Sequence, residues 1–325
     1  MFIHRRRGWE IAEREATPEA IVTGRRALLG AAGAVAFGAA PAEAQWNIFG
    51  QRPTMPKSAE RPPLAAPRNA KYDPGRAITP EPEATSYNNF YEFGQSKSVF
   101  DEAQALKTAD WKIELAGMIA KPRTIGVDDL LKQVSLEERV YRHRCVEAWA
   151  MTVPWVGFQL SELVRLAEPT SNAKYLVFTT LADKATMPGL RQSWYPWPYT
   201  EGVTIDEAMN ELAFLSVGMF GKVIPPQNGA PIRLTLPWKY GFKSAKSIVK
   251  ITFTDTRPVN FWQALQDSEY GFWANVNPEI PHPRWSQAKE RLLGTDEMVA
   301  TRIWNGYGEF VAPLYANLKN ERLFA

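Results

Sequence analysis

The sequence predicts an α+β domain with a mixed β-sheet and short helices. Short runs of alternating apolar and polar residues are interspersed with short runs at helical spacing, without the regular strand–helix–strand order of a parallel α/β fold. The 325 residues include 12 tryptophans and 25 prolines, and this composition favours a loop-rich fold with aromatic pockets. The chain shows no internal repeat and no glycine-rich nucleotide-binding motif.

Two strands and a helix are expected first. Residues 111–119 alternate apolar and polar side chains before a Lys-Pro turn, which indicates a strand. Residues 127–134 follow the pattern of a short amphipathic helix. Residues 139–145 alternate again, so the odd-numbered side chains, Cys145 among them, would share one face of a strand.

Three further strands and two helices are expected after that. Residues 160–166 and 205–209 have helical spacing. Residues 175–180 are rich in β-branched and aromatic side chains and end in two threonines, which favours a strand. Residues 232–236 and 247–254 have the same character, whereas the C-terminal third is aromatic and irregular.

The N-terminal residues have the pattern of an export signal. Arg25-Arg26 precede an apolar, small-residue run that ends at Ala42-Glu43-Ala44, and this order is typical of a twin-arginine (Tat) signal. We therefore predict that residues 1–44 are removed, that residues 45–84 form an extended arm, and that residues 85–325 form the main domain in the periplasm. A cytosolic protein with a basic N-terminal arm is the alternative.

The charge distribution argues against nucleic acid as a partner. The formal net charge is only +3, and no cluster of lysines and arginines follows the predicted signal.

Cys145 is the only cysteine, so the chain cannot form an internal disulfide. A lone thiol in an oxidising compartment is exposed to oxidation, which suggests that Cys145 has a specific role. With His4 removed, His143 and His282 are too few for a three-histidine zinc site. The sequence also lacks the motifs of covalent haem and of iron–sulfur clusters.

A cysteine hydrolase with His143 as base is disfavoured by geometry. Residues two apart on a strand lie about 6–7 Å apart, beyond hydrogen-bond reach. The leading interpretation is that the soft thiolate of Cys145 binds a redox metal whose other ligands come from an organic cofactor.

Five blocks, taken in order, resemble one family. They are residues 87–93 (YNNFYEF), 144–149 (RCVEAW), 153–157 (VPWVG), 226–233 (PQNGAPIR) and 240–247 (YGFKSAKS). This set is similar to the periplasmic protein-methionine-sulfoxide reductases, which are molybdopterin enzymes with the sulfite-oxidase-type fold. The resemblance extends over nearly the whole mature chain.

The resemblance implies a Mo-molybdopterin cofactor, with Cys145 as the metal ligand and catalytic residue. It also implies nine cofactor contacts, which are Asn88, Tyr91, Glu92, Thr180, Asn228, Arg233, Ser244, Ala245 and Lys246. Amide and carboxyl groups suit the pterin edge, and arginine and lysine suit its phosphate. Taken singly, the same residues are also ordinary turn residues, strand ends or surface charges.

The implied activity is the reduction of methionine sulfoxide in oxidised periplasmic proteins, by oxygen-atom transfer to the reduced metal. The resemblance further implies a membrane haem-b subunit as electron donor. His143 is expected to pack or to donate a hydrogen bond, not to bind metal. Glu147 either orients the turn after the ligand or is exposed.

Two other functions stay open. A sulfite oxidase would share the fold, but its ligand cysteine is followed by arginines, whereas here Glu147 would repel a sulfite dianion. A non-catalytic exported binding protein would use tryptophans to stack on sugars or peptides. Five tryptophans either form the wall of a substrate cleft or fill the core, namely Trp149, Trp155, Trp194, Trp197 and Trp238.

Overall fold

The computed structural model describes residues 60–324. These residues belong to a unit that begins at Pro53. The predicted signal at 1–44 lies outside the described residues. In the described part of the predicted arm, Tyr72 and Thr79 are buried, and the Leu64 amide donates to the Gly221 carbonyl at 2.8 Å.

Twelve strands are found in the described residues. Their bounds are β1 Lys112–Gly117, β2 Arg123–Gly126, β3 Glu137–Arg144, β4 Trp149–Gln159, β5 Tyr175–Thr180, β6 Thr200–Thr204, β7 Phe214–Met219, β8 Lys222–Val223, β9 Arg233–Thr235, β10 Ile248–Thr254, β11 Lys289–Leu292 and β12 Met298–Ala300.

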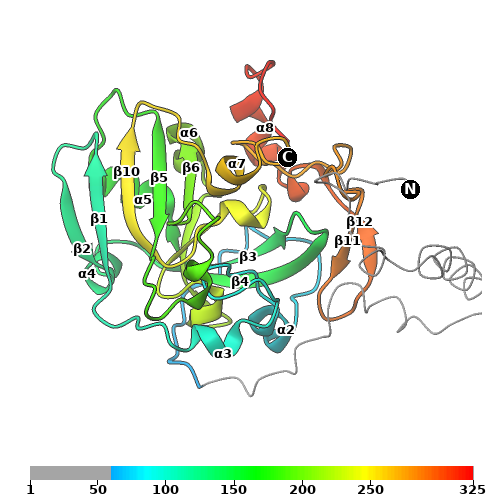
Figure 1. The fold of residues 1–325 in the computed structure, drawn as a ribbon, viewed down its shortest axis with the longest axis horizontal. Helices are drawn as coiled ribbons and strands as arrows, with labels where there is room; N and C mark the ends of the chain where they lie inside the picture. Colours follow the sequence, from blue (N-terminus) through cyan, green and yellow to red (C-terminus); the bar gives the residue numbers. More distant parts are fainter. Residues whose placement is uncertain (1–59, 325) are drawn as a thin grey trace, which may run out of the picture. The chain divides into compact units, whose positions relative to one another are not determined.

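The strands form two mixed sheets (Figure 1). The first has the order β2-β1-β10-β5-β6, in which only β1 and β10 are parallel. The second has the order β12-β11-β4-β7-β8, with β3 paired to β4 and β9 paired to β7. Its one parallel pair is β11 with β4. The predicted mixed α+β architecture is confirmed.

The helices are short. The α-helices are α2 Glu81–Ser86, α3 Phe100–Ala103, α4 Val127–Leu131, α5 Leu160–Ala167, α6 Ile205–Met209, α7 Phe261–Leu265 and α8 Gly308–Tyr315, and the 3₁₀ turns are η3 Pro188–Arg191, η4 Pro226–Asn228, η5 Gly241–Lys243 and η6 Ile303–Gly306. Helix α2 spans the position at which we expected the main domain to begin. No helix in residues 60–324 has the length and apolarity needed to cross a membrane.

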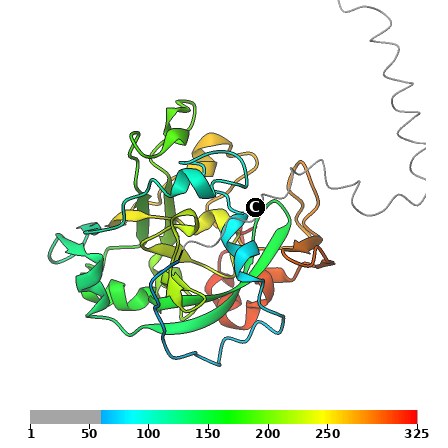
Figure 2. The same ribbon diagram turned by 90° about the horizontal axis from the view of Figure 1, so that it is seen from below.

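One apolar core joins both sheets. Trp155 and Phe158 from β4, Phe178 from β5 and Phe253 from β10 are fully buried in it. The loop between β5 and β6 lies beside α7 (Figures 1 and 2), and the rings of Tyr195 and Phe261 stack there with centroids 5.7 Å apart. This loop and α7 together form part of the wall of the site described below.

The predicted strands and helices are all found, with ends that differ by a few residues. The predictions missed β4 and β7, because every residue of β7 and ten of eleven in β4 are buried, so neither strand alternates. They also missed the short elements α2, α3, β2, β6 and β8. The same holds for the C-terminal third, where β11 and β12 form a small hairpin and α8 packs on the core.

Candidate active site

A cavity of about 430 Å³ lies where three polar turns meet. The turns are residues 89–92 after α2, residues 145–147 after β3, and residues 241–246 at η5. Six of the ten predicted site residues line the cavity, and they are Tyr91, Glu92, Cys145, Ser244, Ala245 and Lys246. Turns that are far apart in the sequence therefore bring one thiol, two carboxyls and one amine to the same cavity.

Cys145 begins a tight turn directly after β3. Its carbonyl accepts from the Ala148 amide at 3.1 Å, and its amide donates to the Trp149 carbonyl at 2.9 Å. Ala148 has a positive φ of 63°, which allows the chain to reverse into β4. Only 5% of Cys145 is exposed, so its sulfur faces the cavity and not bulk solvent.

Two N–H groups point at the sulfur of Cys145. The Asn89 side-chain amide and the Glu147 backbone amide each donate to Sγ at 3.5 Å. Burial, followed by the nearby charge of Glu147, raises the pKa of the thiol to about 12. A bound metal cation would reverse this balance, because a coordinating thiol is deprotonated by the charge of the metal.

Glu147 is held by three donors. Its carboxylate accepts from the Asn89 amide at 2.9 Å, from the Trp149 indole at 3.0 Å and from the Lys97 ammonium at 2.8 Å. Burial acts to raise the pKa of Glu147, but the charge of Lys97 and these hydrogen bonds outweigh it and lower the pKa below its usual value. Of the two roles left open for Glu147, the structure supports an oriented carboxylate, 3.6 Å from the sulfur.

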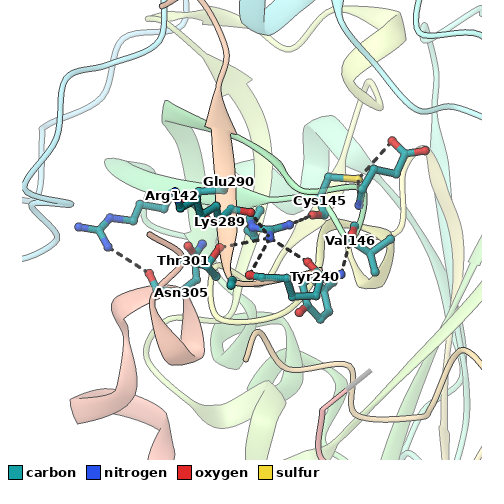
Figure 3. A network of polar contacts seen from close by, with 12 residues as sticks. Arg142, Cys145, Val146, Tyr240, Lys289, Glu290, Thr301 and Asn305 are labelled. Atoms are coloured by element: carbon teal, nitrogen blue, oxygen red, sulfur yellow. Dashed lines mark hydrogen bonds and ion pairs between the residues drawn. The ribbon is translucent and has the colours of Figure 1, made fainter. Parts of the chain in front are cut away.

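A buried polar network fixes the turn from the opposite side (Figure 3). Arg144 is fully buried, donates to the carbonyl of Cys145, and forms an ion pair with Glu290 at 2.9 Å. The side chains of Gln287 and Trp285 each donate to the Val146 carbonyl at 2.7 Å. The backbone of the turn at residues 145–148 is therefore tied to β11 and to the segment before it, which restricts movement of the sulfur.

Glu92, which lines the cavity, forms a buried pair with Thr180 behind it. The Thr180 hydroxyl, at the end of β5, donates to the Glu92 carboxyl at 3.0 Å. Burial raises the pKa of Glu92. Thr180 does not line the cavity, so its direct role here is to position Glu92.

Arg233 is a buried cation without an ionic partner in the described residues. It is 2% exposed, and its guanidinium donates to two carbonyls, those of Asn228 at 3.0 Å and Leu234 at 3.3 Å. Burial lowers the pKa of Arg233 to about 10. Its third contact, at 3.5 Å, reaches the carbonyl of Ser244, which lines the cavity.

Lys246 is a second cation that forms no ion pair with a carboxylate in the described residues. Its ammonium donates to the Asn89 carbonyl at 2.8 Å, and burial, with repulsion from Arg233, lowers its pKa to about 7. The buried Arg233 and the partly buried Lys246 repel each other, and no described carboxylate forms an ion pair with either of them, although the Glu92 carboxyl attracts Lys246. An anionic group such as a phosphate would neutralise both.

Two buried amide oxygens also lack partners. Oδ1 of Asn88 and Oδ1 of Asn228 accept no hydrogen bond, while the Asn228 amide donates to the Ala84 carbonyl at 3.0 Å. Neither asparagine lines the cavity, and the same holds for Arg233. These unpaired polar atoms and the unpaired cations fit the donor and acceptor requirements of a pterin with a phosphate.

His143 packs against the backbone of the third turn. A Cβ added to Gly241 would lie 2.5 Å from its Nε2, so only glycine allows this approach. Burial, with the charges of Arg233 and Lys246, lowers the pKa of His143 well below its usual value. A neutral packing histidine agrees with the expectation from the sequence.

The tryptophans separate into two groups. Trp155 and Trp238 are fully buried and Trp149 is 5% exposed, so these three fill the core, while Trp194 is 65% exposed. None of the five named from the sequence lines the cavity, and its aromatic wall contains Trp262 and Trp285 instead.

Several site residues were missed by sequence reasoning, namely Asn89, Lys97, Arg144, Arg284 and Trp285. Asn89 and Arg144 lie inside blocks that carried the resemblance, so those blocks could have identified them. Lys97 and the pair at 284–285 reach the site only through tertiary contacts.

Within residues 60–324, no three side chains of His, Cys, Asp and Glu come together as a possible metal site.

Comparison with known proteins gives two close matches in sequence. Residues 101–262 match the family model of the oxidoreductase molybdopterin binding domain. The chain is 46% identical over 322 residues to the protein-methionine-sulfoxide reductase catalytic subunit MsrP of Burkholderia mallei, and the match covers 98% of this chain and 96% of that relative.

Among solved structures, the sulfane dehydrogenase SoxCD of Paracoccus pantotrophus aligns with a TM-score of 0.43 and 15% identity. This match covers 74% of this chain and spans 60% of the other chain's length.

Proposed function

The chain belongs to the protein-methionine-sulfoxide reductase family of molybdopterin oxidoreductases, and on that premise we propose that it reduces methionine sulfoxide residues in oxidised proteins. The overall change is the conversion of a sulfoxide, two electrons and two protons into a thioether and water. When bound, molybdopterin supplies a metal that exchanges two electrons and accepts an oxygen atom.

The observation that carries this proposal is the position of Cys145. Its sulfur faces a cavity that also contains the ammonium of Lys246, and Arg233 lies behind the wall. Cys145 would bind the metal, and Arg233 and Lys246 would hold the phosphate. Asn88, Tyr91, Glu92, Thr180 and Asn228 would hold or support the pterin, together with Ser244 and Ala245.

Glu147 bears on the choice between sulfoxide and sulfite. Its carboxylate lines the cavity, whereas its ionic partner Lys97 does not. A sulfite dianion would approach this negative charge, but a sulfoxide is neutral and would not be repelled. The carboxylate of Glu147 therefore disfavours sulfite as a substrate, as the sequence already indicated.

Metal analysis and substrate tests decide among the three functions. We expect about one molybdenum and one pterin per purified protein, reduction of peptide methionine sulfoxide with a reduced dye, and no comparable oxidation of sulfite. Protein that purifies without molybdenum and pterin from cells able to make the cofactor would support a binding protein. Sulfite oxidation without sulfoxide reduction would support a sulfite oxidase.

Cys145→Ser tests the metal ligand. A hard hydroxyl replaces the soft thiolate, so turnover should fall by at least about a hundredfold while the pterin stays bound. Pterin content and unfolding temperature serve as controls for folding. Wild-type turnover in this variant would remove Cys145 from the reaction.

Export through the Tat pathway to the periplasm is part of this proposal, and it is supported by Arg25-Arg26 and the run that follows. Replacing both arginines by lysine should leave the precursor in the cytoplasm, as measured by cell fractionation. Normal export of the double variant would contradict the proposed location.

The chain has no haem or iron–sulfur motif of its own, so it needs an electron donor. A membrane haem-b subunit is proposed in this role on the family resemblance. Oxidised periplasmic proteins are the proposed substrates. Cells without such a donor should contain loaded protein that turns over with a dye but not with quinol.

A further inference from the structure

Trp194 is the most exposed large apolar side chain in residues 60–324, at 65%. Single exposed apolar residues are common on protein surfaces, so exposure alone carries no meaning. The position of Trp194 is what distinguishes it. Its ring lies 5.9 Å from the ring of Tyr195, and Tyr195 lines the cavity next to Trp262.

The segment that carries Trp194 is held in place on both sides. The Trp197 indole donates to the Gln192 carbonyl at 3.0 Å, and the Gln95 side chain donates to Gln192 at 2.7 Å and to the Tyr195 hydroxyl at 3.1 Å. Tyr195 also stacks on Phe261 of α7. The exposed indole therefore stands on a supported loop, and little conformational entropy would be lost when a ligand covers it.

A methionine sulfoxide inside a polypeptide cannot be bound by the cavity alone. Only its side chain can enter, so the residues before and after it must lie on the rim. Neighbouring Cα atoms are about 3.8 Å apart, and alternate side chains of an extended chain are about 6–7 Å apart. Tyr195 lines the cavity and its ring lies 5.9 Å from that of Trp194, so the exposed indole stands beside the rim that such flanking residues must cross.

We propose that Trp194 is the docking platform for the substrate polypeptide and packs against an apolar side chain one or two residues from the sulfoxide. This inference rests on the proposed reductase function. An indole face gains most from covering aliphatic or aromatic groups, so the site favours oxidised methionines with apolar neighbours over the free amino acid.

Steady-state kinetics with a reduced dye test the platform. Three substrates are compared, namely a peptide with leucines beside the sulfoxide, the same peptide with glycines, and free methionine sulfoxide. In Trp194→Ala, kcat/KM for the leucine peptide should fall about five- to tenfold through KM, to the level of the glycine peptide. The other two substrates should be unaffected, and Trp194→Phe should retain most of the preference.

Met298→Ala is the matched control, because Met298 is 51% exposed and does not line the cavity. It should leave all three substrates unchanged. Equal rates for wild type and Trp194→Ala on the leucine peptide would overturn the proposal. An equal loss on all three substrates, or a loss seen only with the membrane donor, would also overturn it and would indicate a structural role or donor docking.

The failure of the reductase function itself is distinguishable. Molybdenum-loaded wild-type protein that reduces none of the three sulfoxides would reject that function. Loaded protein that reduces all of them without any effect of Trp194 would reject only the platform.

Discussion

Two regions of the molecule bury cations in opposite ways. Near β6 and α6, Lys239 pairs with Glu207 at 2.5 Å and Lys243 pairs with Glu201 at 2.6 Å. Beside the cavity, Arg233 and the partly buried Lys246 contact neutral carbonyl oxygens, and no described carboxylate forms an ion pair with them. The first region neutralises its charges internally, whereas the second leaves two positive charges for a ligand.

The contrast separates stability from function. The folded protein depends on each buried ion pair that it contains, because removal of one partner leaves the other charge buried and unpaired. An unpaired buried cation destabilises the empty protein and is favourable only when an anion binds. The fold therefore carries a cost at Arg233 and Lys246 that the cofactor would remove.

Lys239→Met should have the largest effect on stability. It leaves the carboxylate of Glu207 buried without its cation, with only Tyr315 and the Thr204 backbone as donors. The free energy of unfolding should fall by about 3–5 kcal/mol, in loaded and empty protein alike.

Urea unfolding measures the loss in Lys239→Met, and adding Glu207→Gln should recover part of it because the buried charge is gone. A loss below about 1 kcal/mol would mean that the Lys239–Glu207 ion pair contributes no more to stability than an exposed ion pair.

Arg233→Met should affect cofactor binding more than folding. Methionine keeps much of the contact with the Trp155 ring, 4.9 Å away, but removes the charge. Molybdenum and pterin content should fall about tenfold or more, because a charge-assisted hydrogen bond to the phosphate is lost.

The empty Arg233→Met protein should be at least as stable as the empty wild type, since no carboxylate loses its partner and an unpaired charge is no longer buried. Full cofactor content in this variant would remove Arg233 from the phosphate site.

The pH dependence of stability should show the smallest effect. In the folded empty protein, burial and repulsion from Arg233 lower the pKa of Lys246 to about 7, from the ordinary lysine value of 10.5. Between these values the unfolded chain binds a proton that the folded protein lacks, so stability should rise with pH across this window. Below pH 7 both states are protonated, and the contribution is constant.

An anionic cofactor raises the pKa of Lys246 again and should therefore flatten this slope in loaded protein. The comparison of loaded and empty wild type with Lys246→Met isolates the effect. If stability changed with pH at the same slope in loaded wild type, empty wild type and Lys246→Met, Lys246 would not face the cofactor.

The sequence predicted much of the fold because local patterns carry it. Residues 175–180 and 205–209 form β5 and α6 with the expected bounds, since each has the periodicity of its element. The strand β4 escaped prediction because almost all of its side chains are buried, and local periodicity then disappears. The same limit applied to β7.

For the site, the sequence alone determined the single thiol at Cys145, and its five blocks indicated the family and a molybdenum cofactor. Which charges are paired was decided only by the tertiary structure. Arg144 and Glu290 are 146 residues apart, and Glu147 meets Lys97 across 50 residues. Contacts over such separations follow from how two sheets pack, and no local pattern of side chains encodes them. For the same reason, Arg233 and Lys246 could be identified as unpaired cations only after every carboxylate near them had been placed.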